Sequence, residues 1–191
     1  PYIYLFDAQG SLLDENDDSN NSLNSRLDFT RALAPGTYCI GMRALSNPDL
    51  PVAVSVRGFD AAAAAAEEYA FADAMPPLEG DYPVTDIGVL PGLSVRDTPV
   101  PGDSARFYSF LIDAPGLILI TADEVSDSDP WLRLFDERGV MIAENDDANG
   151  TLDSELAVRV EPGRYTVAVR QYSTATNGVV RLAIERYVPM R

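Results

Sequence analysis

Hydrophobic and polar residues alternate along much of this chain. In "LAVRVEPGRYTVAV", residues 156–169, apolar side chains occupy every second position on both sides of Pro162-Gly163. A period of two is typical of a β-strand with one buried face, and Pro-Gly between two such runs indicates a turn. Residues 104–126 also read as two strands, with a turn at Ala114-Pro-Gly. Many short strands joined by such turns predict an all-β fold, an antiparallel β-sandwich.

An internal repeat organises these strands. "YIYLFD" at 2–7 and "WLRLFD" at 131–136 each combine aromatic and branched residues and run into an Asp-x-x-Gly turn. They lie in two aligned stretches, 1–29 and 130–158. The identical pairs include Pro1/Pro130, Leu5/Leu134, Phe6/Phe135, Asp7/Asp136, Gly10/Gly139, Glu15/Glu144, Asn16/Asn145, Asp17/Asp146, Asp18/Asp147 and Ser25/Ser154.

The alignment extends further along both copies. "PGTYCIGMR" at 35–43 matches "PGRYTVAVR" at 162–170, and "VAVSVRGF" at 52–59 matches "VRLAIERY" at 180–187. The second copy is preceded by the strand-like residues 81–129, which the first copy lacks. We therefore predict a tandem repeat in which 1–59 is the C-terminal half of a first sandwich and 83–191 is a complete second one.

The stretch between the copies, 60–82, has a different composition. It begins "DAAAAAAEEYA", in which poly-Ala with Glu-Glu has high helix propensity, and Pro76-Pro77 would stop a helix. We predict a short helix over 60–74 followed by an extended, Pro-rich connector. A flexible low-complexity linker is the open alternative.

Charge and composition exclude several classes of function. The net charge is −16, and such a surface repels nucleic-acid phosphates and anionic lipid. No apolar run approaches the ~20 residues of a membrane span, so we predict neither a nucleic-acid partner nor membrane insertion. With no His and a single Cys, Cys39, a His-based catalytic triad, a His-containing zinc site and an internal disulfide are excluded.

Acidic and amide side chains gather around the repeated Glu-Asn-Asp-Asp run. Ca²⁺ takes about six to eight oxygen ligands from carboxylates, amides and carbonyls, and crowded carboxylates repel one another unless a cation or solvent neutralises them. We predict a Ca²⁺ loop between strands; the alternative is a solvated turn. The candidate ligands are Asp127, Asp129, Asp136, Asn145, Asp146, Asp147 and Asp153, and more weakly Asp7, Asn16, Asp17, Asp18 and Asn24 of the first copy.

The loop is not an EF-hand, although "NDDANG" at 145–150 imitates the start of one. The position that needs a bidentate Glu is Leu156, and no flanking helices are evident. Paired carboxylates could also serve a glycosidase. Here the acids lie in turn sequences with no evident aromatic cleft, so we predict that the chain is not an enzyme.

The second copy resembles the bacterial pre-peptidase C-terminal domain family. The residues that carry the resemblance are an aromatic strand at Phe107-Tyr-Ser-Phe, then Asp129-Pro-Trp-Leu-Arg-Leu-Phe-Asp136, Asn145-Asp-Asp147 and Gly163-Arg-Tyr165. The resemblance covers about 85–187 fully and 1–59 as a half copy. It implies a jelly-roll-like β-sandwich, secreted and non-catalytic, and some similar domains bind Ca²⁺.

These observations lead to the expected function, a secreted, extracellular or periplasmic, Ca²⁺-binding accessory or adhesion module that binds a protein or polysaccharide. The alternative is a structural subunit of a surface assembly. Half a sandwich would expose its core and its strand edges. We therefore expect a cleaved N-terminal fragment, cut at an Asp-Pro bond before Pro1, or a neighbouring subunit to complete it, unless the sequence is simply a fragment.

Overall fold

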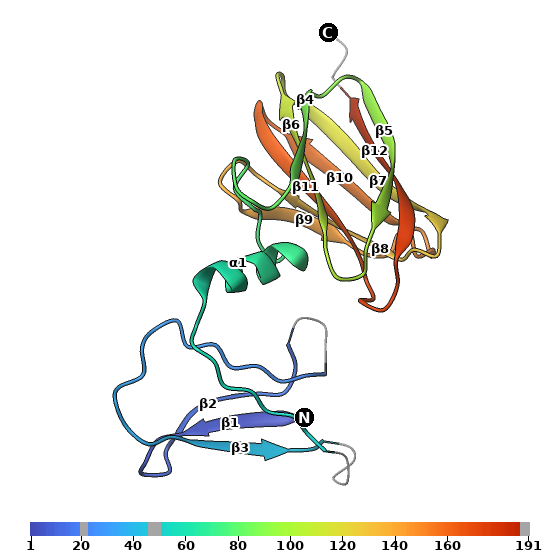
Figure 1. Ribbon diagram of the computed structural model, residues 1–191. Helices are drawn as coiled ribbons and strands as arrows, with labels where there is room; N and C mark the ends of the chain where they lie inside the picture. Colours follow the sequence, from blue (N-terminus) through green and yellow to red (C-terminus); the bar gives the residue numbers. More distant parts are fainter. Residues whose placement is uncertain (20–22, 46–50, 188–191) are drawn as a thin grey trace. The chain divides into compact units, whose positions relative to one another are not determined.

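The computed structural model describes residues 1–19, 23–45 and 51–187 (Figure 1). The chain divides into an N-terminal unit, Pro1–Ala64, and a C-terminal unit, Ala65–Arg191. Among the described residues, the helical segment is too short and too polar to cross a membrane.

The C-terminal unit is built from two sheets. One contains β4 (Val84–Val89), β6 (Arg106–Ile112), β8 (Pro130–Phe135), β9 (Met141–Asn145) and β11 (Gly163–Gln171), in the order β4-β6-β11-β8-β9. The other contains β5 (Leu93–Val100), β7 (Gly116–Ser126), β10 (Ser154–Val160) and β12 (Gly178–Tyr187), in the order β10-β7-β12-β5. Neighbouring strands are antiparallel except β4 and β6, which are parallel. The predicted all-β sandwich is confirmed.

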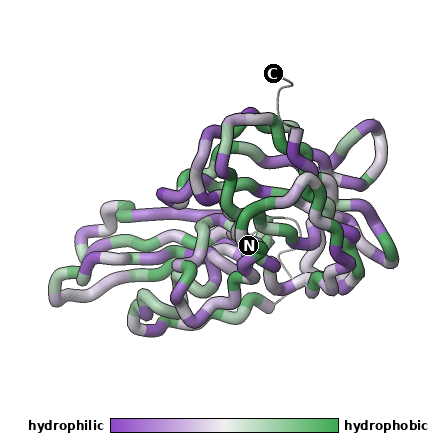
Figure 2. The backbone as a smooth tube through the Cα atoms, turned by 90° about the horizontal axis from the view of Figure 1, so that it is seen from above, coloured by the Kyte–Doolittle hydropathy of each residue, from purple (hydrophilic) through white to green (hydrophobic). Residues whose placement is uncertain are grey.

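The core of this unit lies between the two sheets, as expected from strands that alternate apolar and polar residues. The tube in Figure 2 switches repeatedly between hydrophobic and hydrophilic residues along the extended segments. The inward-facing side chains are almost completely buried, and they include Leu132, Leu134, Val167, Val169, Val180, Leu182 and Ile184. One polar pair is buried with them: the hydroxyls of Thr98 and Tyr108 share a hydrogen bond of 2.9 Å.

The predicted helix forms as α1 (Ala61–Ala70). Asp60 caps its N-terminus, because its Oδ1 accepts the backbone N–H groups of Ala62 and Ala63 at 3.0 and 3.1 Å. The stretch after the helix was expected to be an extended connector, but it packs on the C-terminal unit. Side chains between Tyr69 and Val84 form a second apolar cluster with Ala105, which precedes β6, and with Phe107, Phe135 and Ala168 of the five-stranded sheet.

The N-terminal unit contains a single sheet in the order β2-β1-β3, made of β1 (Tyr2–Phe6), β2 (Leu12–Asn16) and β3 (Cys39–Arg43). Its pairing is that of β9-β8-β11 at every aligned residue. Leu5 faces Ile40 as Leu134 faces Val167, and the β1–β2 bulge recurs in β8–β9. Similar local sequence therefore gives the same three-stranded arrangement in both units.

The Asp-x-x-Gly turns form as predicted in both units. The N–H of Gly10 donates to the carbonyl of Asp7, and the N–H of Gly139 donates to that of Asp136, each at 3.0 Å. Gly10 and Gly139 have φ values of 80° and 77°, a left-handed conformation that glycine adopts without steric cost.

Candidate functional site

Most of the predicted cation ligands of the C-terminal unit meet at one end of the five-stranded sheet. Asp127 and Asp129 connect β7 to β8, while Asn145, Asp146 and Asp147 lie at the end of β9. The antiparallel pairing of Leu132 with Asn145 brings the start of β8 beside the end of β9. We call Glu124, Asp129, Asp146 and Asp147 the acidic end.

Electrostatics confirm that these carboxylates are close together. The pKa of Asp129 is raised, first by partial burial and then by the negative charges of Asp147, Asp146 and Glu124. Within the described part of the chain, the carboxylates of Asp129, Asp146 and Asp147 accept no hydrogen bond and form no ion pair. The acidic end therefore concentrates uncompensated negative charge, which attracts cations.

Glu124 was not among the ligands expected from the sequence. It belongs to the last residues of β7, in the run Asp123-Glu124. The neighbouring Asp123 also has a raised pKa, from partial burial and then from the charge of Asp153. The sequence did contain a sign of this position. The apolar strand Gly116–Ser126 has consecutive acids near its end, and acids near the end of a strand lie near the loop that follows it.

Two other predicted ligands, Asn145 and Asp153, have structural partners instead. The Oδ1 of Asn145 accepts the N–H of Glu155 at 3.1 Å. The Oδ1 of Asp153 accepts the N–H of Glu124 at 2.8 Å, and its Oδ2 accepts the hydroxyl of Thr151. Asp127 has φ 45°, in the left-handed region. The hydrogen bonds of Asn145 and Asp153 therefore stabilise the loops next to Asp129, Asp146 and Asp147.

Asp136 does not reach the acidic end. It follows the far end of β8, and a strand of this length rises about 3.3 Å per residue, so roughly 20 Å separate it from Asp129. Its Oδ1 accepts the N–H groups of Arg138 and Val140 at 2.9 Å, and its Oδ2 pairs with the Arg138 guanidinium at 2.8 Å. The same contacts hold the pKa of Asp136 below its usual value. It stabilises the turn.

The weaker candidates in the N-terminal unit repeat these structural roles. The Oδ1 of Asp7 accepts the N–H groups of Gln9 and Ser11, as in the Asp136 turn. The Oδ1 of Asn16 accepts the N–H of Arg26 at 3.1 Å, the counterpart of the Asn145–Glu155 bond. The backbone carbonyls of Asp17 and Asn24 accept the hydroxyls of Ser25 and Ser19. For Asp18 the structure gives only its position, after β2.

Bringing carboxylates together does not by itself make a metal centre. Across residues 1–19, 23–45 and 51–187, no group of three or more His, Cys, Asp or Glu side chains is arranged to hold a metal ion. A Ca²⁺ at the acidic end would therefore require Asp146 and Asp147 to close on Asp129, with carbonyls or water supplying the remaining ligands.

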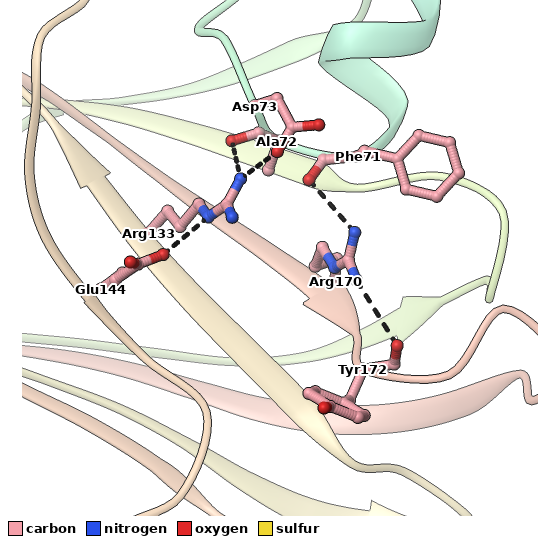
Figure 3. Close-up of polar contacts among 7 residues, drawn as sticks. All are labelled: Phe71, Ala72, Asp73, Arg133, Glu144, Arg170 and Tyr172. Carbon is pink, nitrogen blue, oxygen red and sulfur yellow. Dashed lines mark hydrogen bonds and ion pairs between the residues drawn. The ribbon is translucent and has the colours of Figure 1, made fainter. Parts of the chain in front are cut away.

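The second charged cluster, on the outer face of the five-stranded sheet, is structural (Figure 3). Arg133 donates to the carbonyl of Ala72 at 2.9 Å and pairs with Asp73 and Glu144. Arg170, almost fully buried, donates to the carbonyls of Phe71 and Tyr172 at 3.2 and 3.4 Å. Burial and the charge of Arg133 lower the pKa of Arg170.

Trp131 lies within this cluster. Its ring is 4.5 Å from the guanidinium carbon of Arg133 and 4.7 Å from that of Arg170, which are cation–π contacts. Together the two arginines and Trp131 fasten the residues after α1 to the sheet.

Opposite effects are expected from replacing two of the aspartates by Asn. Asp129→Asn should raise the melting temperature at pH 7, because the raised pKa means that the charged form destabilises the fold. Asp136→Asn should lower it, because the depressed pKa means that its charged form stabilises the fold.

The pH dependence provides the check, in thermal melts between pH 7 and about 3. The Asp129 effect should vanish as the pH falls through its raised pKa to below the usual value of 3.8. The Asp136 effect should persist at 3.8 and fade only below it. A lower melting temperature for Asp129→Asn at pH 7 would contradict the repulsion inferred at the acidic end.

Comparison with known proteins gives structural likeness alone. No family model matches the chain, and no curated protein matches it. The pre-peptidase C-terminal domain of a collagenase from Bacillus anthracis is similar over 54% of this chain and 95% of its own, with 20% identity and a TM-score of 0.46. A periplasmic inhibitor of g-type lysozyme from Aeromonas hydrophila is similar over 55% and 97%, with 16% identity and a TM-score of 0.41. A surface-associated copper-binding protein of Methylomicrobium album is similar over 56% and 98%, with 12% identity and a TM-score of 0.39.

Proposed function

We propose that this chain is a non-catalytic accessory module of an exported bacterial protein, acting outside the cell or in the periplasm, and that its acidic end binds Ca²⁺. The observation that carries the proposal is the cluster of Asp129, Asp146 and Asp147. Partial burial and then the charges of Asp147 and Asp146 raise the pKa of Asp129, and none of the three carboxylates has an ion-pair partner in the described chain. A hard divalent cation with oxygen ligands relieves that repulsion.

The residues around the cluster have distinct roles in this proposal. Asp129, Asp146 and Asp147 bind the ion, and Glu124 adds negative charge. Asn145 and Asp153 hold the loops through backbone N–H groups. Bound Ca²⁺ would fasten the β7–β8 connection to the end of β9. The ion thus rigidifies the module, which in turn presents a surface to a protein or polysaccharide partner.

A pocket lies at the opposite end of β8, and its Asp136 does not suit the role of a glycosidase acid. Asp136, Glu137, Arg138, Pro162, Gly163, Arg164 and Tyr165 line it. Its Asp136 is ion-paired with Arg138 and has a lowered pKa. A glycosidase needs one carboxylic acid with a raised pKa as its proton donor, and Asp136 is tuned in the opposite direction.

Thermal unfolding in CaCl₂ and in chelator tests Ca²⁺ binding. Trp131 is the only tryptophan, so its fluorescence follows the C-terminal unit. Ca²⁺ at a hundredfold excess over its Kd should stabilise this unit by about 2.7 kcal/mol. The double variant Asp146→Asn/Asp147→Asn should lose the response, whereas Asp17→Asn/Asp18→Asn, at the aligned positions of the N-terminal unit, should keep it. Identical melting curves with CaCl₂ and chelator would refute Ca²⁺ binding.

A further inference from the structure

The sheet of the N-terminal unit has a core-type face without a sheet against it in the described chain. In the C-terminal unit the corresponding face packs on the four-stranded sheet, and Val167 and Val169 of β11 are each 0% exposed. Their aligned residues on β3, Ile40 and Met42, are 42% and 47% exposed. On β1, Leu5 is buried. The two three-stranded arrangements have the same register. One face is covered by a second sheet in the C-terminal unit, and the aligned face is partly exposed in the N-terminal unit.

The edge of this sheet is open as well. β11 pairs with β8 on one side and with β6 on the other. Its counterpart β3 pairs with β1 alone among the described strands. Cys39 of β3 is exposed, whereas the aligned Thr166, between β6 and β8, is 1% exposed. An unpaired edge with free N–H and C=O groups is a template for strand addition.

Two further segments of the N-terminal unit have strand sequences but form no strand. Residues 25–31 align with β10 and residues 52–59 with β12. In the C-terminal unit these two strands do not pair with each other; β7 lies between them and pairs with both. The structure contains no counterpart of β7 in the described part of the N-terminal unit.

The exposure of the second segment shows what β7 contributes. Val180, Leu182 and Ile184 of β12 are 0%, 1% and 1% exposed. Val52, Val54 and Val56, at the aligned positions, are 39%, 43% and 79% exposed. Residues 52–59 alternate apolar and polar residues as β12 does, but they form no strand because a counterpart of β7 is missing from the described part of the N-terminal unit.

We propose that the N-terminal unit is an acceptor for a two-strand polypeptide segment from outside Pro1–Ala64. The segment has the chemistry of β6–β7: two strand sequences rich in apolar residues, joined by a short turn. Its first strand adds antiparallel to the edge of β3, as β6 does to β11. Its second lies between residues 25–31 and 52–59, as β7 lies between β10 and β12. Both acceptor segments become strands as the donor binds.

A synthetic peptide of residues 104–126, "SARFYSFLIDAPGLILITADEVS", serves as the probe. Added to the full chain, it should protect the amides of 39–43 and 52–59 from hydrogen exchange, with no change in 180–187. It should also slow alkylation of Cys39, the single cysteine, by about tenfold or more. A control peptide carrying Ile118→Asp and Ile120→Asp should do neither, because both side chains face a core.

A variant of the acceptor provides the matched test. Val54→Asp/Val56→Asp should abolish protection by the probe without altering the Trp131 unfolding curve of the C-terminal unit. Three results would overturn the proposal. The first is no protection at the solubility limit of the probe, and the second is that amides of 52–59 are as protected in the free chain as those of 180–187. The third is protection that appears with a dimer in the absence of peptide. The last result would assign the open face to a second copy of the chain.

Discussion

Leu182→Ala should lower the free energy of unfolding of the C-terminal unit by about 3 kcal/mol, because it removes a fully buried side chain and leaves a cavity. Leu182 lies in the middle of β12, which pairs with β7 on one side and β5 on the other. Neighbouring strands on both sides limit how far the site can collapse. Urea denaturation followed by Trp131 fluorescence measures the loss.

The aligned residue of the N-terminal unit supplies the control. Val54→Ala should change the stability of either unit by less than about 0.5 kcal/mol, because Val54 is 43% exposed and lies in no strand. A Val54→Ala cost as large as that of Leu182→Ala would mean that the N-terminal unit already has a closed core, and would count against the acceptor face as well.

A second large loss, again about 3 kcal/mol, is expected from Gly102→Ala. A Cβ at this position would lie less than 3.0 Å from the carbonyl oxygens of Thr174 and Thr176. Both are backbone atoms, so relief requires the loop after β5 to move away from the loop between β11 and β12. That movement also strains the hydrogen bond from the Gly102 N–H to the Asn177 side chain, at 3.0 Å.

Gly92→Ala is the matched comparison for Gly102→Ala. No heavy atom lies within 4 Å of a Cβ at Gly92. Its melting temperature should therefore equal that of the unchanged chain or exceed it slightly, because alanine restricts the unfolded state. Equal melting temperatures for both variants in a calorimetric scan would show that the two loops separate at no cost.

The sequence was sufficient for the fold class and for most of the elements, although residues 25–31 and 52–59 of the predicted half sandwich form no strand. Alternation predicted the strands, the poly-Ala run predicted the helix, and the Asp-x-x-Gly turns formed as expected at Gly10 and Gly139. It was not sufficient for the packing of Phe71, Ala72 and Asp73 on the sheet. That contact depends on Arg133 and Arg170, whose charges make them look like solvent-facing positions of an alternating strand.

The sequence identified which residue types make up the candidate site, but it did not show how these residues are arranged. A list of acidic residues does not say which end of a strand each one occupies. Asp129 and Asp136 flank the same strand, β8, yet one is repelled by neighbouring acids and the other is held by Arg138. Asn145 has the residue type of a Ca²⁺ ligand, but its amide oxygen accepts a backbone N–H. Only the tertiary structure distinguishes a residue that could bind a cation from one that stabilises a turn or a loop.

The shared register of the two three-stranded sheets also bears on the order of folding. β1, β2 and β3 adopt the pairing of β8, β9 and β11 although no second sheet packs on them in the described chain. Local turns are therefore enough to specify the β1–β2 and β8–β9 hairpins, whereas β12 pairs with β7, which is much more distant in sequence. Contacts with small sequence separation form fastest. The β8–β9 hairpin is thus the natural starting point from which the sandwich of the C-terminal unit assembles.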